Sequence, residues 1–438
     1  MRFLILLVIA IPLGWYAYYD SKKGPPDDTP KKDKVFSVEA DKIDEIEVKS
    51  ESGDRTTLRK KGSDWEIVQP MTAASDQAAV SGITSNLASA EIQRVIEENP
   101  PDLKEYGLDS PRVEVAFKMN GQQRRLLLGQ KTPAGSDIYA KLPDSKRVFL
   151  VPSFLDSTFN RSTFDLRDKS VLKVDRDKVD SLEVATKDRT MRFEKKNGEW
   201  QIAQPPAGRA EFGAVDGLVS RVSSVQMKSI VPDATDLKKS GLDKPVATVR
   251  LGSGSSQASL AIGSAAESGS VYAKDLSRPT VFTIESSLAD DLKKDPSEYR
   301  QKDLFDARSF NTSRLEIVHD NQTTVFEKTK IKNKDGKEEE KWKQTAPAAK
   351  DVDASKVEAL ITAATGARAT GFVDSTAKTG LDKPELTVAF KYDEGKEERV
   401  TFARTKDGAY GARAGAPGAA KVDAAVIDSI VKALGDVK

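Results

Sequence analysis

The stretch YGLDSP, residues 106–111, recurs as SGLDKP at residues 240–245 and as TGLDKP at residues 379–384. In the first copy a short helical turn is expected to end at Gly107, because glycine adopts the left-handed cap conformation without a Cβ penalty. Leu108 is expected to pack inward, and the Asp109 carboxylate to accept nearby backbone N–H groups. Pro111 stops the helix and holds its predecessor extended, so a strand should follow. The phrase therefore predicts a helix end that leads into a strand.

A chemical interpretation of the same phrase would make its three aspartates metal ligands or acids. These are Asp109, Asp243 and Asp382. The sequence offers no partner constellation around them for such a site. We favour an architectural role.

The repeat extends well beyond this phrase. VEADKIDEIEV at 38–48 aligns with VDRDKVDSLEV at 174–184 and more loosely with FNTSRLEI at 310–317, and WEIVQP, WQIAQP and WKQTAP follow at 65–70, 200–205 and 342–347. So long a period indicates tandem domains rather than a solenoid of 20–50-residue repeats. The repeated signature residues are Trp65, Pro70, Gly107, Leu108, Asp109, Pro111, Trp200, Pro205, Gly241, Leu242, Asp243, Pro245, Trp342, Pro347, Gly380, Leu381, Asp382 and Pro384.

Each copy combines strands with helices. RVEVAF alternates apolar and charged residues as a half-buried antiparallel strand does, and Asn120-Gly121 supplies a tight hairpin turn. Between the Trp strand and the signature, apolar residues at spacings of three and four predict one amphipathic helix. Its buried positions are Val80, Ile83 and Leu87, then Val215, Leu218 and Val222, then Val357, Leu360 and Ile361. A second short helix is expected around 153–159 and 286–293, and at 422–434 in the last copy.

The fold class is therefore α+β: three tandem homologous modules of antiparallel strands with packed helices, after one amino-terminal transmembrane helix. The ranges are a transmembrane anchor at 1–19, a Pro-rich charged linker at 20–34, module 1 at 35–172, module 2 at 173–308 and a C-terminally truncated module 3 at 309–438.

The amino terminus predicts membrane attachment. Residues 3–19 are uncharged and mostly apolar, and as a helix they would span about 25 Å, slightly less than a bilayer's hydrocarbon core. The alternative is a cleaved secretory signal, but bulky Tyr and Trp occupy the positions where a small-x-small cleavage site would lie. Arg2 precedes the segment and several lysines follow it, so the positive charges on its two sides favour opposite orientations in the membrane. Only two residues precede the segment, and so short an amino-terminal head favours export of the rest of the chain.

Composition excludes several functions. The chain has no cysteine and one histidine, which removes disulfides, thiolate chemistry and multi-histidine metal sites. Lys+Arg 69 against Asp+Glu 68 leaves no basic field to attract nucleic acid. We therefore expect no cofactor, no metal site, no nucleic-acid partner and no recognisable small-molecule substrate.

Other motifs give weak signals. GSGSS at 252–256 aligns with hairpin turns rather than with a phosphate loop, and NKDGKEEE at 333–340 reads as an elongated hairpin tip. SVLK and STAK, at 170–173 and 375–378, fit Ser-x-x-Lys but lack companion motifs. His319 is expected to face solvent at a strand end. The recurring tryptophans are expected to be core anchors, with a sugar-stacking platform as the alternative.

In the order of these motifs, the chain resembles the bacterial domain of unknown function 4340 family, from about residue 35 to the end. The third copy departs from the pattern, because WKQTAP loses its apolar alternation and VTFA loses the final glycine of LLLG and LAIG. The resemblance implies a membrane-anchored, extracytoplasmic accessory protein, often encoded beside ABC-2 transporter components of the gliding-motility kind. It implies no catalytic residues.

The leading hypothesis is a non-enzymatic scaffold or adaptor, single-pass in the bacterial inner membrane, with the bulk of the chain periplasmic and transport-complex proteins as partners. The alternative is a tandem binding protein for cell-envelope glycan or another polymer, with one weak site per module. A third candidate is a hydrolase of unrecognised type. Recurring exposed aromatics would favour the second, and a pocket with convergent carboxylates or a Ser–Lys pair the third.

Overall fold

The computed structural model describes residues 32–204, 207–232, 234–332 and 338–437. The predicted anchor at 1–19 and most of the predicted linker lie outside these residues, as do Pro205 and most of the NKDGKEEE tip. Within the part that is described, no helix is long and apolar enough to cross a membrane.

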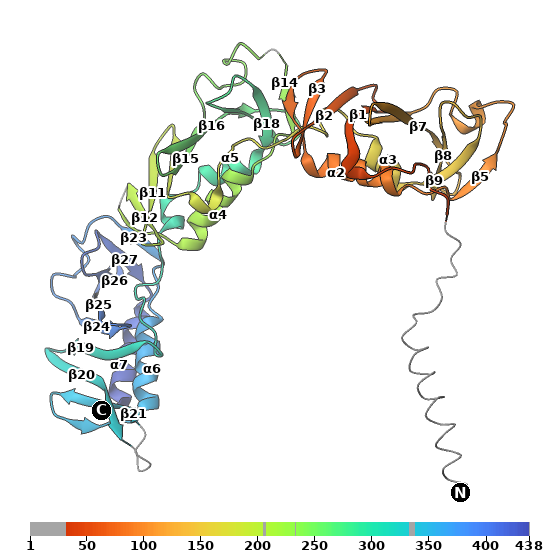
Figure 1. The fold of residues 1–438 in the computed structure, drawn as a ribbon. Helices are drawn as coiled ribbons and strands as arrows, with labels where there is room; N and C mark the ends of the chain where they lie inside the picture. The colour runs from red at the N-terminus through yellow and green to blue at the C-terminus, as the bar shows by residue number, and fades with distance from the viewer. Residues whose placement is uncertain (1–31, 205–206, 233, 333–337, 438) are drawn as a thin grey trace, which may run out of the picture. The chain divides into compact units, whose positions relative to one another are not determined.

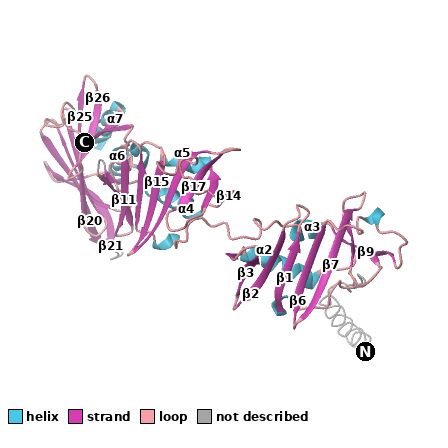
Figure 2. Cartoon of the chain, turned by 90° about the horizontal axis from the view of Figure 1, so that it is seen from above, coloured by secondary structure: helices cyan, strands magenta, loops and turns pink. Residues whose placement is uncertain are grey.

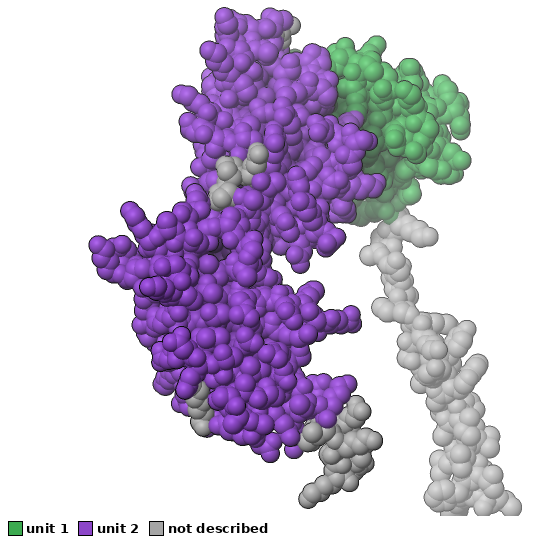
Figure 3. All heavy atoms as spheres, turned by 90° about the vertical axis from the view of Figure 1, so that its left-hand side faces the viewer, with its two compact units in different colours: residues 1–169 green, residues 170–438 purple. Residues whose placement is uncertain are grey.

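Three antiparallel sheets of nine strands follow one another along the chain, each with helices beside it, so the α+β class and the three tandem modules are confirmed (Figure 1). The chain forms two compact units, residues 1–169 and 170–438 (Figure 3). The first unit holds the first sheet, and the second unit holds the other two.

The first sheet has the strand order β4-β3-β2-β1-β6-β7-β8-β9-β5. Its elements are β1 (Ile43–Lys49), β2 (Arg55–Lys61), β3 (Asp64–Gln69), β4 (Ala73–Ala74), α2 (Gln77–Ser89), β5 (Arg94–Glu97), β6 (Val113–Met119), β7 (Gln122–Lys131), β8 (Asp137–Lys141), β9 (Val148–Pro152) and α3 (Phe154–Phe159). The hairpin turn at Asn120-Gly121 is confirmed, with φ of 53° and 76° at the two residues.

The second and third sheets repeat this order. The second uses β10 (Ser181–Thr186), β11 (Thr190–Lys196), β12 (Glu199–Gln204), β13 (Gly208–Arg209), α4 (Phe212–Ser224), β14 (Ser229–Val231), β15 (Ala247–Ser253), β16 (Ser256–Ala265), β17 (Ser270–Asp275), β18 (Val281–Glu285) and α5 (Ser286–Leu292). The third uses β19 (Thr312–His319), β20 (Gln322–Lys332), β21 (Glu338–Ala346), β22 (Lys350–Asp351), α6 (Ala354–Thr365), β23 (Gly371–Val373), β24 (Leu386–Tyr392), β25 (Lys396–Thr405), β26 (Gly408–Arg413), β27 (Ala419–Val422) and α7 (Ala424–Val437).

Each core lies between the sheet and its helices, which cover one face of the strands (Figure 2). The helix positions predicted to be buried are confirmed, since all nine are fully buried. Alternation along β6 is confirmed as well: Val113, Val115 and Phe117 are buried, while Glu114 points to the other face. Burying these apolar side chains, at about 25 cal/mol per Å², is the main stabilisation of each module.

Short segments between the sheets fasten each module to the chain that follows it. Arg167 pairs with Ser75 of the first module, and Ser170 pairs with Gln226 of the second. At the next junction Arg300 pairs with Ala210, and Asp303 pairs with Arg368. Leu304 and Phe305, which the predicted ranges assign to module 2, pack in the core of the third. Only two residues therefore separate the last pairing of one module from the first pairing of the next.

Candidate functional site

The face of each sheet that the helices leave open carries a glutamate at the same place on its first strand. Glu47, Glu183 and Glu316 each stand between two buried apolar residues, so the alternation of the strand turns the carboxylate outward. The quoted repeats contain this residue three times, yet sequence reasoning did not single it out.

In the second module two arginines hold this glutamate from the flanking strands. Arg192 on β11 and Arg250 on β15 both lie directly opposite Glu183 in the strand register. The Arg192 Nε donates to Oε2 at 2.6 Å, and the Arg250 Nη1 donates to Oε1 at 2.8 Å. One carboxylate therefore ties three strands together on the open face.

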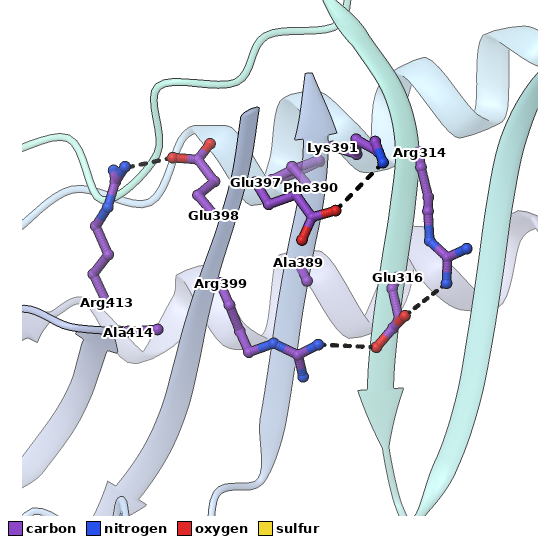
Figure 4. Close-up of a pocket in the computed structure, with 10 residues that line it drawn as sticks. All are labelled: Arg314, Glu316, Ala389, Phe390, Lys391, Glu397, Glu398, Arg399, Arg413 and Ala414. Carbon is purple, nitrogen blue, oxygen red and sulfur yellow. Dashed lines mark hydrogen bonds and ion pairs between the residues drawn. The ribbon is translucent and has the colours of Figure 1, made fainter. Parts of the chain in front are cut away.

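The third module has a similar clamp (Figure 4). Arg314 donates to Glu316 at 2.9 Å, and Arg399 of β25 reaches the other carboxylate oxygen at 3.3 Å. The hydrogen bond to Glu316 leads the contacts that hold the pKa of Arg314 above its ordinary value, although burial opposes them.

The first module distributes the same charges over two carboxylates. Within the described part of the chain, Glu47 is approached only by Arg55, at 3.4 Å. Glu45 instead accepts from Lys118 at 2.6 Å and from Arg59 at 2.9 Å. The hydrogen bond from Lys118, followed by that from Arg59, holds the pKa of Glu45 below its ordinary value.

In the third module the open face is hollowed to about 540 Å³ around Ala389. Figure 4 shows the charged side chains that line this hollow and their ion pairs. They are the cations Arg314, Lys391, Arg399 and Arg413 and the anions Glu316, Glu397 and Glu398. Glu398 is fully buried, and it accepts the backbone N–H of Ala307 at 2.7 Å as well as the guanidinium of Arg413 at 3.0 Å.

The charged side chains of this hollow are paired with one another. Each lining carboxylate has a cation within 3.4 Å. No group of three or more His, Asp or Glu residues able to hold a metal ion occurs among the residues described. The open faces are suited to meeting a surface of complementary charge.

The signature phrase lies on this same open face, over the far end of each of the first two sheets. The turn η2 (Lys104–Tyr106) ends at Gly107 with φ of 64°, as predicted. The Leu108 N–H bonds to the Leu103 carbonyl at 3.0 Å, and that of Gly107 bonds to Lys104 at 2.9 Å, which is the Schellman pattern. Leu108 is buried, and with Tyr106 and Val148 it forms a small second core.

A second glycine lets this segment approach the sheet. A Cβ on Gly129 would lie 2.1 Å from the Tyr106 carbonyl oxygen, and a Cβ on Gly263 would lie 2.1 Å from that of Ser240. Gly129 and Gly263 are the final glycines of LLLG and LAIG. Two motifs that are distant in the sequence therefore meet, which sequence spacing alone did not reveal.

The prediction that the signature aspartate accepts nearby backbone N–H groups is wrong. Asp109, Asp243 and Asp382 are exposed, and their carboxylates accept no hydrogen bond within the described part of the chain. Instead, Asp102 caps the turn seven residues earlier by accepting from Lys104 N at 3.0 Å, and Asp236 does the same for Lys238 N at 3.1 Å. The first N–H groups of a helical turn have no carbonyl acceptor within the turn, so a carboxylate at its start, such as Asp102, can accept from them. Asp109 comes after the end of the turn, where the N–H groups already have acceptors.

The other signature residues have structural places. Trp65, Trp200 and Trp342 are buried, so the core-anchor interpretation is confirmed. Pro111, Pro245 and Pro384 each precede a strand by two residues. Pro70 and Pro347 are exposed and follow cis peptide bonds. Gly241 and Gly380 have φ of 66° and 74°.

The remaining sequence motifs form no site. GSGSS is the turn between β15 and β16, as predicted. His319 does end a strand, but it is not solvent-facing: its side chain is only 20% exposed, because it lies on the same face of β19 as the buried Leu315 and Ile317. Its Nδ1 lies 3.4 Å from Asp320. Ser375 accepts a backbone N–H from Ala377 at 3.1 Å, which is a turn contact.

The model of the family described as a domain of unknown function (DUF4340) matches residues 65–208 and 200–384. The chain belongs to this family. Both matches begin at a signature tryptophan, in β3 and β12, so the family unit includes the segment that joins one module to the next.

No curated protein matches the chain. A crystal structure of a DnaN sliding clamp from Pseudomonas aeruginosa, bound to griselimycin, aligns over 89% of this chain and 93% of that one with 8% identity and a TM-score of 0.15. So low a score does not establish a shared fold.

Proposed function

We propose that this chain is a non-enzymatic scaffold or adaptor, anchored in the bacterial inner membrane through residues 3–19, with its modules outside the cytoplasm. Its partners are subunits of a transport complex of the ABC-2, gliding-motility type. The observation that carries the proposal is the threefold repetition of an open sheet face bearing an outward glutamate paired with arginine.

A repeated charged surface suits docking better than it suits chemistry. Paired surface charges contribute little to the stability of a fold, about 0–1 kcal/mol each, so a glutamate–arginine pair that recurs in all three modules calls for another role. Charges fixed in direction by neighbouring strands set the orientation and register of a protein that docks on them. Three such faces on one chain would raise the affinity of individually weak contacts.

The glycan-binding alternative has less support. Glycan binding would be indicated by an aromatic side chain exposed at the same place in each module. The tryptophans that recur are buried, and the exposed phenylalanines of the described chain, Phe154, Phe212 and Phe310, occupy unrelated positions. A hydrolase is supported still less, because the lining carboxylates are engaged by cations.

The test is purification of the tagged full-length chain from its own membranes. We expect transporter subunits to accompany it, and expect the variant with Glu47→Lys, Glu183→Lys and Glu316→Lys to lose them. The matched control carries Asp144→Lys, Asp188→Lys and Glu358→Lys, which makes the same charge change at exposed sites in the three modules. Equal recovery of partners by both triple variants would refute docking through the open faces.

The anchor is tested separately. Full-length chain should stay in the membrane fraction after carbonate extraction, whereas a chain that lacks residues 1–34 should be released. Release of both would reject the anchor, and recovery of no transporter subunit by an anchored chain would reject the partner.

A further inference from the structure

Arg300, between the second and third modules, is a buried cation whose side chain forms no hydrogen bond with a described residue. Its side chain is 10% exposed, and its guanidinium carbon lies 4.1 Å from the centre of the Phe372 ring. No acceptor among the described residues lies within hydrogen-bonding distance of the guanidinium. Its nearest carboxylate, Asp374, is 3.9 Å away and is itself 78% exposed.

The neighbouring charges are already matched to one another. Asp306 is bound by both Arg209 and Arg413, and Arg413 also pairs with the buried Glu398. Asp303 pairs with Arg308 at 3.0 Å and with Arg368 at 3.1 Å. Among the described residues, Arg300 is therefore the cation of this cluster whose charge is met only by the 3.9 Å pair with Asp374.

Arg300 lines a small cavity of about 70 Å³. Arg209, Gln301 and Phe372 line it too, with the backbone of Gly411 and Gly418. A water molecule needs roughly 10–15 Å³ on such a measure, so the cavity holds a group of a few heavy atoms and no larger ligand. Three of its lining side chains are cationic and one, Asp303, is anionic.

Burial explains why a ligand would be favoured here. Removing a guanidinium from water without a compensating acceptor is costly, and burial accordingly lowers the pKa of Arg300. The Phe372 ring packs against the guanidinium carbon and accepts no N–H···O hydrogen bond, so the N–H groups still need oxygen acceptors. Two parallel N–H groups match the two oxygens of a carboxylate or phosphate.

We propose that this cavity is an oxyanion site, in which Arg300 binds a carboxylate or phosphate group through two hydrogen bonds. The equivalent arginine of the first module, Arg167, differs because its guanidinium lies 3.3 Å from the Met71 sulfur and has intermediate exposure. The site is independent of the open faces and of the docking proposed for them.

The test titrates the full-length chain in detergent with sodium phosphate and, separately, with sodium acetate, at constant ionic strength set by sodium chloride. Hydrogen exchange of the peptides that contain Arg300 and Phe372 is the measurement. We expect saturable protection by at least one anion, with the stronger of the two identifying the oxyanion. Arg300→Gln should weaken binding at least about tenfold, and Arg300→Lys, which keeps the charge but loses the fork, by less.

Lys187→Gln removes one positive charge from an exposed position of the same unit that does not line the cavity, and should bind as the unchanged chain does. If Arg300→Gln fails to fold, Phe372→Leu keeps the packing, removes the ring over the guanidinium, and should still weaken binding several-fold. Protection no greater than that given by chloride, or equal protection in Arg300→Gln, would overturn the site and leave an adventitious ion only.

Discussion

The turn that carries the repeated GLD-x-P phrase packs against the sheet in the first two modules differently from the way it packs in the third. In the first two modules Leu108 and Leu242 donate their N–H groups to the carbonyls of Leu103 and Leu237, and these leucines lie in the same small second cores. In the third module Thr376 replaces that earlier leucine, and Leu381 is only partly buried.

The strand beneath changes together with the segment. Ala403 occupies the place of Gly129 and Gly263, and its Cβ lies 3.4 Å from the position a Cβ on Gly380 would take. Within the described residues the third module forms no second core like those of the first two. The glycine on the strand and the leucine in the turn therefore work as a pair, and the phrase GLD-x-P alone does not bring the turn as close to the sheet.

The largest expected effect comes from filling the space between the two motifs. Gly129→Ala should destabilise the first module by at least about 3 kcal/mol, because the new Cβ would overlap a backbone carbonyl that cannot move by itself. The measurement is native-state hydrogen exchange of β6 and β7 peptides, which reports the free energy of local unfolding.

The matched control is Gly82→Ala in α2, where a Cβ would meet nothing within 4 Å. It should stabilise the module by about 0.5–1 kcal/mol. Ala403→Gly in the third module should cost only about 0.5–1 kcal/mol. If Gly129→Ala were as harmless as Gly82→Ala, the close approach would not exist in solution.

The second effect compares the turn leucines. Leu108→Ala removes a side chain that is 3% exposed and should cost about 2–3 kcal/mol. Leu381→Ala removes one that is only partly buried and should cost about 1 kcal/mol. Hydrogen exchange of β7 and β25 peptides measures the two losses within one chain. Equal losses would mean that the third module closes over its turn as the first does.

Sequence reasoning predicted the parts of the fold that depend on local periodicity. The helix faces, the strand alternation of β6, the Asn-Gly hairpin and the left-handed Gly107 each follow from a few adjacent residues. The contact of Gly129 with the signature turn depends on strand register, and so does the clamp on Glu183, which three strands build. Arg300 stands out because the described residues around it provide no hydrogen-bond acceptor for its guanidinium, and those neighbours are known only from the fold. These features depend on pairings that one sequence does not specify.

A smaller effect distinguishes the charge patterns of the open faces. Because its hydrogen bonds lower the pKa of Glu45, the folded module binds fewer protons there than the unfolded chain. The stability that these hydrogen bonds contribute is complete at a pH above the pKa of glutamate in the unfolded chain, about 4.3. It disappears as the pH falls through the lower pKa that Glu45 has in the folded module. Glu45→Gln should therefore cost about 0.5 kcal/mol near neutral pH and progressively less below about pH 4.

Urea unfolding, read by exchange of β1 and β6 peptides, measures this difference at each pH. Asp44→Asn, at an exposed position on the same strand, is the matched control, because it removes a carboxylate without removing these contacts. A cost of Glu45→Gln that stays constant down to acid pH would contradict the assignment of the lowered pKa to these contacts.

The smallest effect decides between architecture and chemistry for the phrase itself. Asp109→Asn, Asp243→Asn and Asp382→Asn should each change stability by no more than about 0.5 kcal/mol, because the exposed carboxylates hold no hydrogen bond in the described structure. Asp102→Asn retains a capping oxygen, whereas Asp102→Ala removes it and should cost about 1 kcal/mol. Hydrogen exchange of the peptides around Tyr106 reports both. The opposite outcome would be that the triple Asp→Asn chain loses stability and that added calcium stabilises only the unchanged chain. The repeated aspartates would then be metal ligands, and the three modules would share a binding function despite the structural difference between their signature turns.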